Sequence, residues 1–282
     1  MADGELAARS AARFVEAPIN YLREGTPDSI YYTNTPERSH LPLRTEVMRI
    51  EDVRPIAGDI TLERHGVQLI HAATAVTDFR DREVAARIHL PELEQALLAQ
   101  FGATKAVLSP FWVHRLNDRA PDFGAPGTTY PGRYAHVDYS DESGPTTARM
   151  MLGDHPDADR LMAGRFMVLN LWRALSPPPQ DCPLCLCDAA SVAAEDLIPS
   201  HVAIGPPGQE RKLSTNMVQH NPAHRWIYFS GMTRNELLVF RGYDSDPDHF
   251  RRVPHTAFDD PSAGADAPPR ESIDIRAAVF FG

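Results

Sequence analysis

The chain has 282 residues, 43% of them hydrophobic, which is enough to fill the core of one large domain or two small ones. The formal charge of −10 argues against a nucleic-acid partner, which needs a basic face. The sequence contains no run of about 18 apolar residues, and its acidic, polar N-terminus lacks the features of a secretory signal, so we expect no membrane span and a cytoplasmic location.

The first third of the chain predicts a mixed region that supports a later core. Residues 1–40 are rich in turn formers and predict an irregular arm on the surface. Between residues 45 and 70 we expect strands, with Ile60 and Leu62 inside one of them. Residues 78–101 predict a helix that breaks or restarts at Pro91. We therefore expect a helical and irregular support region over residues 1–104.

From residue 105 onward, short β-rich runs alternate with turns rich in proline and glycine. A helix is expected to intrude near residues 148–162. Many short strands at fairly regular spacing are typical of a sandwich or barrel, and about eight of them fit a jelly roll. The predicted fold is mainly β with flanking helices: residues 105–282 form a double-stranded β-helix, a cupin-like jelly roll, within a single compact domain.

The three cysteines of the chain lie together at Cys182, Cys185 and Cys187. Cys-x-x-Cys is half of a structural zinc site, but no second Cys/His pair follows at finger-like spacing. The leucines between the cysteines favour a buried strand. We therefore predict buried free thiols in a reducing compartment.

A histidine and an aspartate two residues apart form the most informative motif. Tyrosine and valine surround His136 and Asp138, so a strand is expected and both side chains project from the same face. With one more histidine from a distant strand, they would form the two-histidine, one-carboxylate facial triad of non-haem Fe(II) oxygenases. A hydrogen-bonded pair without metal is the alternative. The second such motif, His155-Pro-Asp157, has a central proline and a polar context that suit a turn.

The third ligand has several candidates, of which the sequence favours His255. It lies in a β-compatible segment near the C-terminus, and Greek-key connections bring such distant strands together. The only Arg-x-Ser of the chain follows it, and Arg270 and Ser272 would offer a guanidinium and a hydroxyl to one carboxylate, as a 2-oxo acid co-substrate requires. A loop histidine bonded to a backbone carbonyl is the alternative. The other candidates are His201, His220, His224 and His249.

These motifs resemble those of a family of Fe(II)/2-oxoglutarate-type oxygenases. The family includes the small component of cephamycin 7α-methoxylation, the fungal gibberellin desaturase and the aspirochlorine-pathway hydroxylase/desaturase. The matching segments run in order from about residue 105 to the end: His136-Val-Asp138-Tyr-Ser, Asn170-Leu-Trp172-Arg173, Pro183-Leu-Cys-Leu-Cys-Asp188, Tyr228-Phe-Ser-Gly-Met232-Thr-Arg-Asn-Glu236, Gly242-Tyr-Asp244-Ser, Pro254-His255-Thr-Ala-Phe258 and Arg270-Glu-Ser272-Ile-Asp-Ile-Arg276.

The resemblance implies a jelly roll with iron at His136, Asp138 and His255, and with 2-oxoglutarate at Arg270 and Ser272. It implies hydroxylation or desaturation of a small natural product with O2. It leaves a homodimer or a biosynthetic partner enzyme open. Two other functions remain as alternatives: an auxiliary partner protein of a biosynthetic hydroxylase or methyltransferase, and a cupin-like metal-binding protein without a redox role.

Further pocket residues are suggested by the same family motifs. Asn170 and Trp172 share one strand face and are assigned to the active site. Arg173 belongs to the same motif but points to the opposite face unless the strand bends; a structural strand with a capped arginine is the alternative. Tyr134 lies outside these motifs and is assigned to an apolar pocket as an aromatic residue, with ordinary core as the alternative. One segment, residues 109–115, departs from the aspartate-histidine-containing version expected in the family, which indicates unusual pocket chemistry nearby.

Overall fold

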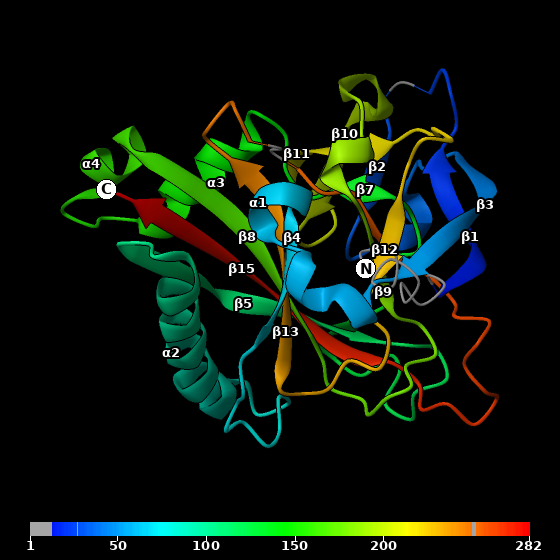
Figure 1. Cartoon of the computed structure of the whole chain (residues 1–282). Helices are drawn as coiled ribbons and strands as arrows, with labels where there is room; N and C mark the ends of the chain where they lie inside the picture. Colours follow the sequence, from blue (N-terminus) through cyan, green and yellow to red (C-terminus); the bar gives the residue numbers. More distant parts are fainter. Residues whose placement is uncertain (1–12, 27, 250–251) are drawn as a thin grey trace, which may run out of the picture.

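The computed structural model describes residues 13–26, 28–249 and 252–282. Two β-sheets dominate it (Figure 1). The nine-stranded sheet has the order β1-β3-β12-β9-β14-β7-β11-β10-β2, and the six-stranded sheet has the order β4-β13-β8-β15-β5-β6. Neighbouring strands are often far apart in the sequence, as expected for Greek-key connections. This β-rich architecture agrees with the predicted fold class.

The elements have the following bounds. The larger sheet contains β1 (Phe14–Leu22), β2 (Ile30–Tyr32), β3 (Leu43–Asp52), β7 (His136–Val137), β9 (Leu184–Cys187), β10 (Leu197–Ile204), β11 (Arg211–Val218), β12 (Trp226–Tyr228) and β14 (His255–Ala257). The smaller sheet contains β4 (Val67–His71), β5 (Lys105–Leu116), β6 (Thr128–Thr129), β8 (Arg165–Ala174), β13 (Glu236–Asp244) and β15 (Glu271–Phe281). The α-helices are α1 (Leu62–His65), α2 (Arg82–Phe101), α3 (Ser143–Leu152) and α4 (Ala158–Ala163); the 3-10 turns are η1 (Pro36–Arg38), η2 (Arg54–Asp59), η3 (Ala189–Ser191) and η4 (Ala194–Asp196).

Strand β8 separates two parts of the core because its side chains alternate between the faces of the six-stranded sheet. Leu169 and Leu171 face outward and belong to the cluster that packs against α2. Trp172 faces inward and packs with residues of the other sheet, such as Leu186. Nearly the whole strand is therefore buried, and its sequence is apolar on both faces.

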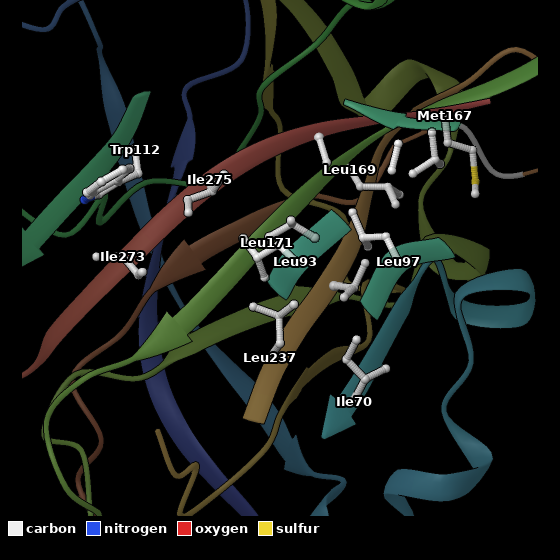
Figure 2. Packing of buried hydrophobic residues seen from close by; sticks show 14 of the residues in the cluster. Ile70, Leu93, Leu97, Trp112, Met167, Leu169, Leu171, Leu237, Ile273 and Ile275 are labelled. Carbon is white, nitrogen blue, oxygen red and sulfur yellow. The ribbon is translucent and has the colours of Figure 1, made fainter. Parts of the chain in front are cut away.

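Helix α2 covers the outer face of the six-stranded sheet (Figure 1). Its buried residues recur at positions 85, 89, 93 and 97, the spacing of one helix face. Figure 2 shows Leu93 and Leu97 against Leu171 and Leu237 of the sheet. The other face of this sheet is thus free to meet the nine-stranded sheet.

Helix α2 is continuous through Pro91, so the predicted break is wrong. The side chain of Asp81 accepts a hydrogen bond from the Val84 N–H at the start, and Gly102 ends the helix with a left-handed φ of +63°. Pro91 lies on the exposed face. We attribute the continuity to burial of the opposite face, which outweighs the loss of one backbone hydrogen bond.

Two further predictions about the first third of the chain are wrong. Residues 14–22 form β1, which pairs with β3 over its full length, whereas an irregular arm was expected; residues 1–12 lie outside the described part of the chain. Alternate burial of Ala17, Ile19 and Tyr21 explains the strand. Leu62 begins α1 rather than continuing a strand, because the side chain of Thr61 accepts a hydrogen bond from the Arg64 N–H and caps the turn.

The two regions into which the sequence was divided share both sheets. Strands β1 to β3 join the larger sheet and β4 joins the smaller one, although all four precede residue 105. The boundary between residues 104 and 105 stays a prediction. The helix expected near residues 148–162 occurs as α3 and α4, and His155 lies in the turn between them.

Truncating a side chain under α2 is expected to destabilise the whole domain. Leu97 is fully buried between α2 and the sheet. Leu97→Ala should lower the free energy of unfolding by about 2–5 kcal/mol, through lost burial and the cavity left behind. Chemical denaturation measures this, with Gln95→Ala on the exposed face of α2 as the control. Equal stability of both variants would contradict the packing role of this face.

Candidate active site

Two histidines from neighbouring strands meet one aspartate between the sheets. In the register of β14 and β7, His255 lies opposite His136, and Asp138 follows directly after β7. The Nε2 atom of His136 is 3.6 Å from Asp138 Oδ1, and that of His255 is 3.7 Å from Asp138 Oδ2. One ligand atom from each residue lies within 4.8 Å of the other two. Among the residues that the structure describes, this is the only such His/Cys/Asp/Glu group.

The backbone sets the tautomer of both histidines. The Nδ1–H of His136 donates to the carbonyl oxygen of Tyr134 at 2.9 Å, and that of His255 donates to the carbonyl oxygen of Val253 at 3.2 Å. Each Nε2 therefore keeps its lone pair and faces Asp138. Metal-binding histidines are commonly oriented in this way by a hydrogen bond from the other ring nitrogen.

Electrostatics leave the three side chains in the protonation states that bind a cation. Burial lowers the pKa of His255 to about 3 and also lowers the pKa of His136, so both rings are neutral near pH 7. Burial by itself raises the pKa of Asp138, but the neighbouring Arg276 charge helps to hold this pKa well below its ordinary value. Two neutral imidazoles and one carboxylate thus converge, which fits a divalent iron ion.

The carboxylate of Asp138 is held in place from the opposite sheet. Its Oδ2 atom accepts hydrogen bonds from the amide of Asn170 on β8 and, at 2.8 Å, from the guanidinium of Arg276 on β15. Arg276 also pairs with Asp274 on the same strand face. Gly242 on β13 permits this packing, because a Cβ there would lie 2.6 Å from the Tyr139 ring and 3.0 Å from Asn170 Oδ1.

Arg270 lies beside the histidines as a buried cation. Its Nε donates to Ser272 Oγ at 3.0 Å and its Nη1 donates to the carbonyl oxygen of Cys182 at 3.1 Å. The guanidinium lies over the Trp172 ring, 5.1 Å from the centroid. Burial lowers its pKa to about 10, so it stays charged at neutral pH. In the described chain, no carboxylate forms an ion pair with Arg270, which leaves its charge available to an added anion.

Two cavities adjoin the triad. The larger has a volume of about 400 Å³, reaches His136 and Asp138, and continues between β5, β10, β11 and α3. The smaller has a volume of about 20 Å³, which is room for about one water molecule, and lies between His136, His255, Trp172 and Arg270. The arrangement therefore places a metal-binding group between a substrate-sized space and a buried cation.

Comparison with known proteins identifies the family. A family described as an oxidoreductase/YMDC permease-like domain matches residues 16–280. The chain belongs to this oxidoreductase family. It is 29% identical to the hydroxylase/desaturase efuI of Hormonema carpetanum, with 95% of each chain covered. It is 28% identical to the Fe(II)/2-oxoglutarate-dependent dioxygenase nvfI of Aspergillus novofumigatus, covering 92% of this chain and 93% of the relative.

A solved structure of the iron and alpha-ketoglutarate-dependent endoperoxidase NvfI is similar over almost the whole length. The TM-score is 0.81 at 25% identity, with 95% of this chain and 98% of the other covered. The match confirms the predicted jelly-roll class. Together with the relatives, it confirms the predicted resemblance to Fe(II)/2-oxoglutarate-dependent oxygenases, the enzyme class and the cofactors Fe(II) and 2-oxoglutarate.

Of the remaining site residues predicted for this oxygenase, some line the cavities and one does not. Tyr134 lines the larger cavity, with its ring centroid 4.8 Å from that of His136, and Trp172 lines the smaller one. Arg173 is not brought to the triad. Successive strand residues alternate, so it faces away, and its guanidinium donates to the carbonyl oxygen of Arg234.

The other histidines considered for the third metal ligand of the oxygenase lie outside the triad. His224 is buried, 3.0 Å from Asp196, and His249 lies 2.7 Å from Glu63. His220 contacts the edge of the Tyr21 ring. His201 lies at the larger cavity, but it is not part of the ligand group of the described residues.

Two residues that support the oxygenase site were not assigned to it from the sequence, which indicated only a structural role for Arg276, neutralising Asp274 or a neighbour. Asp274 and Arg276 continue the alternation that begins with Arg270 and Ser272, so they share the inner face of β15. That spacing was a usable signal. All three cysteines are free and buried, as predicted, and burial raises the pKa of Cys187 to about 12.

None of the helices in the described part of the chain combines the length and apolar character that a membrane crossing requires.

Removing the charge beside Asp138 is expected to weaken iron binding without removing a ligand. Arg276→Gln loses the cation that stabilises the ionised carboxylate and fixes its orientation. Since such supporting contacts are typically worth about 10- to 100-fold in metal affinity, the Kd for Fe(II) should rise by that factor in anaerobic calorimetry. Arg165→Gln breaks another arginine–aspartate pair, with Asp244, and serves as the control. An unchanged Kd in the Arg276 variant would show that Asp138 needs no such support.

Proposed function

We propose that this protein hydroxylates or desaturates a small natural product, with Fe(II) held by His136, Asp138 and His255. The observation that carries the proposal is the convergence of two Nε2 atoms and one carboxylate from β7, its following residue and β14. Fe(II), when bound with 2-oxoglutarate and O2, supplies the oxidant that removes hydrogen from a C–H bond. The protein orients the carbon that reacts.

We assign the anchor of 2-oxoglutarate to Arg270 and Ser272. A buried guanidinium without a carboxylate partner in the described chain is unfavourable by itself, and a bound carboxylate would neutralise it. The hydroxyl of Ser272 lies within reach of the same anion. Because the smaller cavity is narrower than the co-substrate, binding requires neighbouring side chains to move apart. Trp172 supplies a flat apolar wall to this space.

The substrate is assigned to the larger cavity. Its volume of about 400 Å³ lies within the range of small-molecule sites. His136 and Asp138 form one end of it, so a bound molecule would place a C–H bond next to the metal position. The aromatic side chains of Tyr134 and Tyr139 form part of the wall and exclude water from that end.

The experiment that tests this function combines co-substrate binding with turnover. Purified protein given Fe(II) and 2-oxoglutarate without O2 should develop a weak visible charge-transfer band, because chelation at the iron is its origin. The same samples, exposed to O2 and a panel of natural products, should release succinate in step with oxidised product. Absence of both the band and succinate would refute the proposal. A band without any oxidised compound would show that the panel lacks the substrate.

The finer predictions about partners and location extend this proposal. We infer a cytoplasmic enzyme that works alone, as a homodimer, or beside a biosynthetic partner enzyme, and that binds no nucleic acid. The formal charge of −10 supports the last point. Sedimentation measurements on the loaded enzyme distinguish a monomer from a dimer.

A further inference from the structure

One arginine lies between the two cavities and has no role in the site described above. Arg115 is in the segment that departs from the family pattern, near the end of β5. Its cross-strand partner on β15 is Ser272 of the co-substrate anchor. Its side chain lines both the larger cavity and the smaller one. It is therefore placed to meet a group that approaches the iron position from the larger cavity.

The charge of Arg115 is not neutralised within the described chain. Its Nη1 donates to the carbonyl oxygen of Tyr130 at 2.8 Å, and no carboxylate of the described residues lies within ion-pair distance of it. Arg276, by contrast, pairs with both Asp138 and Asp274. A guanidinium with one neutral partner keeps most of its donors for an anion.

The loaded site retains this positive charge. Around the two cavities, four arginines face two aspartates, namely Arg115, Arg211, Arg270 and Arg276 against Asp138 and Asp274. Fe(II) adds two positive charges and 2-oxoglutarate adds two negative ones, so loading leaves the balance unchanged. One carboxylate of the co-substrate would bind the metal, and the other is assigned to Arg270. Arg115 and Arg211 are therefore the two cations without a counter-charge in the described chain, and of these two only Arg115 also lines the smaller cavity beside the histidines.

Apolar side chains make up much of the outer part of the larger cavity, where Arg211 lies against the sulfur of Met150. Phe111, Met150 and Ile204 are 77%, 53% and 45% exposed and are among the few large hydrophobic side chains that the described surface leaves so open. All three line this cavity. Exposed apolar groups gathered at a cavity are typical of a ligand-binding site. The cavity thus combines a mainly apolar outer part with a cationic inner wall.

We propose that the substrate is a lipophilic carboxylic acid whose carboxylate binds Arg115, a proposal that rests on the function assigned above. The apolar body of the molecule packs against Phe111, Met150 and Ile204. The carboxylate lies deep in the larger cavity, near Tyr31 and Tyr134, which line this cavity and whose ring centroids are 5.5 Å apart. The acid is thereby oriented with one end fixed beside the metal position.

The competing role for Arg115 is a second contact to 2-oxoglutarate, since it neighbours Ser272. The charges argue against this role, because both co-substrate carboxylates already have partners. The two roles differ in what an Arg115 variant loses: affinity for an acid in the larger cavity, or affinity for 2-oxoglutarate.

The test uses the enzyme loaded anaerobically with Fe(II) and 2-oxoglutarate. The probes are 1-naphthaleneacetate, decanoate and abietate, each compared by calorimetry with the primary amide of the same skeleton. At least one acid should bind the natural protein about tenfold or more tightly than its amide, as a charge-assisted hydrogen bond allows. Arg115→Gln should abolish this preference and leave the Kd for 2-oxoglutarate unchanged, whereas Arg115→Lys should retain part of it.

The control is Arg87→Gln, which removes the same charge from the exposed face of α2 and should keep the full preference. The proposal is overturned if no acid is preferred over its amide, if the preference survives in Arg115→Gln, or if that variant loses 2-oxoglutarate instead. The charge-transfer band, recorded first in each sample, separates the two proposals. Its absence from the natural protein refutes the oxygenase function, while its presence without acid preference refutes only the role of Arg115.

Discussion

Replacing His136 by alanine is expected to abolish tight binding of Fe(II). The Nε2 atom of the ring is one of three converging ligand atoms. The Nδ1–H of the same ring donates to the Tyr134 carbonyl oxygen, so Nε2 is the ligand atom that the residue offers. Alanine offers no such atom. Since loss of a supporting contact alone costs about 10- to 100-fold, loss of a ligand should raise the Kd for Fe(II) by more than about 100-fold. Anaerobic calorimetry measures this, and the visible band with 2-oxoglutarate should vanish.

The matched control is His155→Ala. His155 belongs to the other His-x-Asp motif, and its Nδ1 accepts from the Asp157 N–H in the turn between α3 and α4. This variant should bind iron like the natural protein. If His155→Ala lost the metal and His136→Ala retained it, the assignment of the metal site would be wrong.

Replacing Arg270 by alanine is expected to weaken 2-oxoglutarate binding selectively. The buried guanidinium offers charged donors, whose hydrogen bonds are typically worth about 1.5–3 kcal/mol, so the Kd for 2-oxoglutarate should rise by about 10- to 150-fold. Iron affinity should change little, because Arg270 contacts neither Asp138 nor the Nε2 atoms in the described structure. Calorimetric titration of 2-oxoglutarate into the Fe(II)-loaded variant measures the effect.

A folding check and two further variants distinguish an effect on 2-oxoglutarate binding from an effect on folding. Arg270 packs over Trp172, so its loss removes contacts as well as charge; thermal unfolding of the variant checks that it folds. Ser272→Ala removes one hydroxyl and should weaken 2-oxoglutarate less than Arg270→Ala does. Arg234→Gln removes an arginine whose side chain donates to the carbonyl oxygens of Val76 and Thr77, and it should leave the affinity unchanged. Full co-substrate affinity in the Arg270 variant would remove the basis of the assignment.

Local spacing accounts for much of what could be predicted about the site. His136 and Asp138 lie two residues apart, as do Arg270 and Ser272, and a period of two places each pair on one strand face. The same rule reaches Asp274 and Arg276, and it explains why Arg173 faces away from its neighbour Trp172. Such relations span only a few residues, so the sequence contains them completely.

Predictions failed where packing overrode a local signal. Pro91 is a helix breaker by itself, yet α2 continues because its other face is buried against the six-stranded sheet. Residues 14–22 contain turn formers, yet they form β1 because β3 supplies the backbone partners. Both outcomes depend on surfaces that lie elsewhere in the chain, which local propensity cannot represent.

The sequence by itself determined the β-rich character, the His-x-Asp pair, the Arg-x-Ser pair and the family. Only the tertiary structure decided that His255 lies opposite His136, that Arg276 reaches Asp138, and that Arg115 stands between the two cavities without an acidic partner in the described chain. The physical reason is that these relations join segments up to about 140 residues apart, and hydrogen-bonded register between strands, rather than any short-range preference, sets which side chains meet.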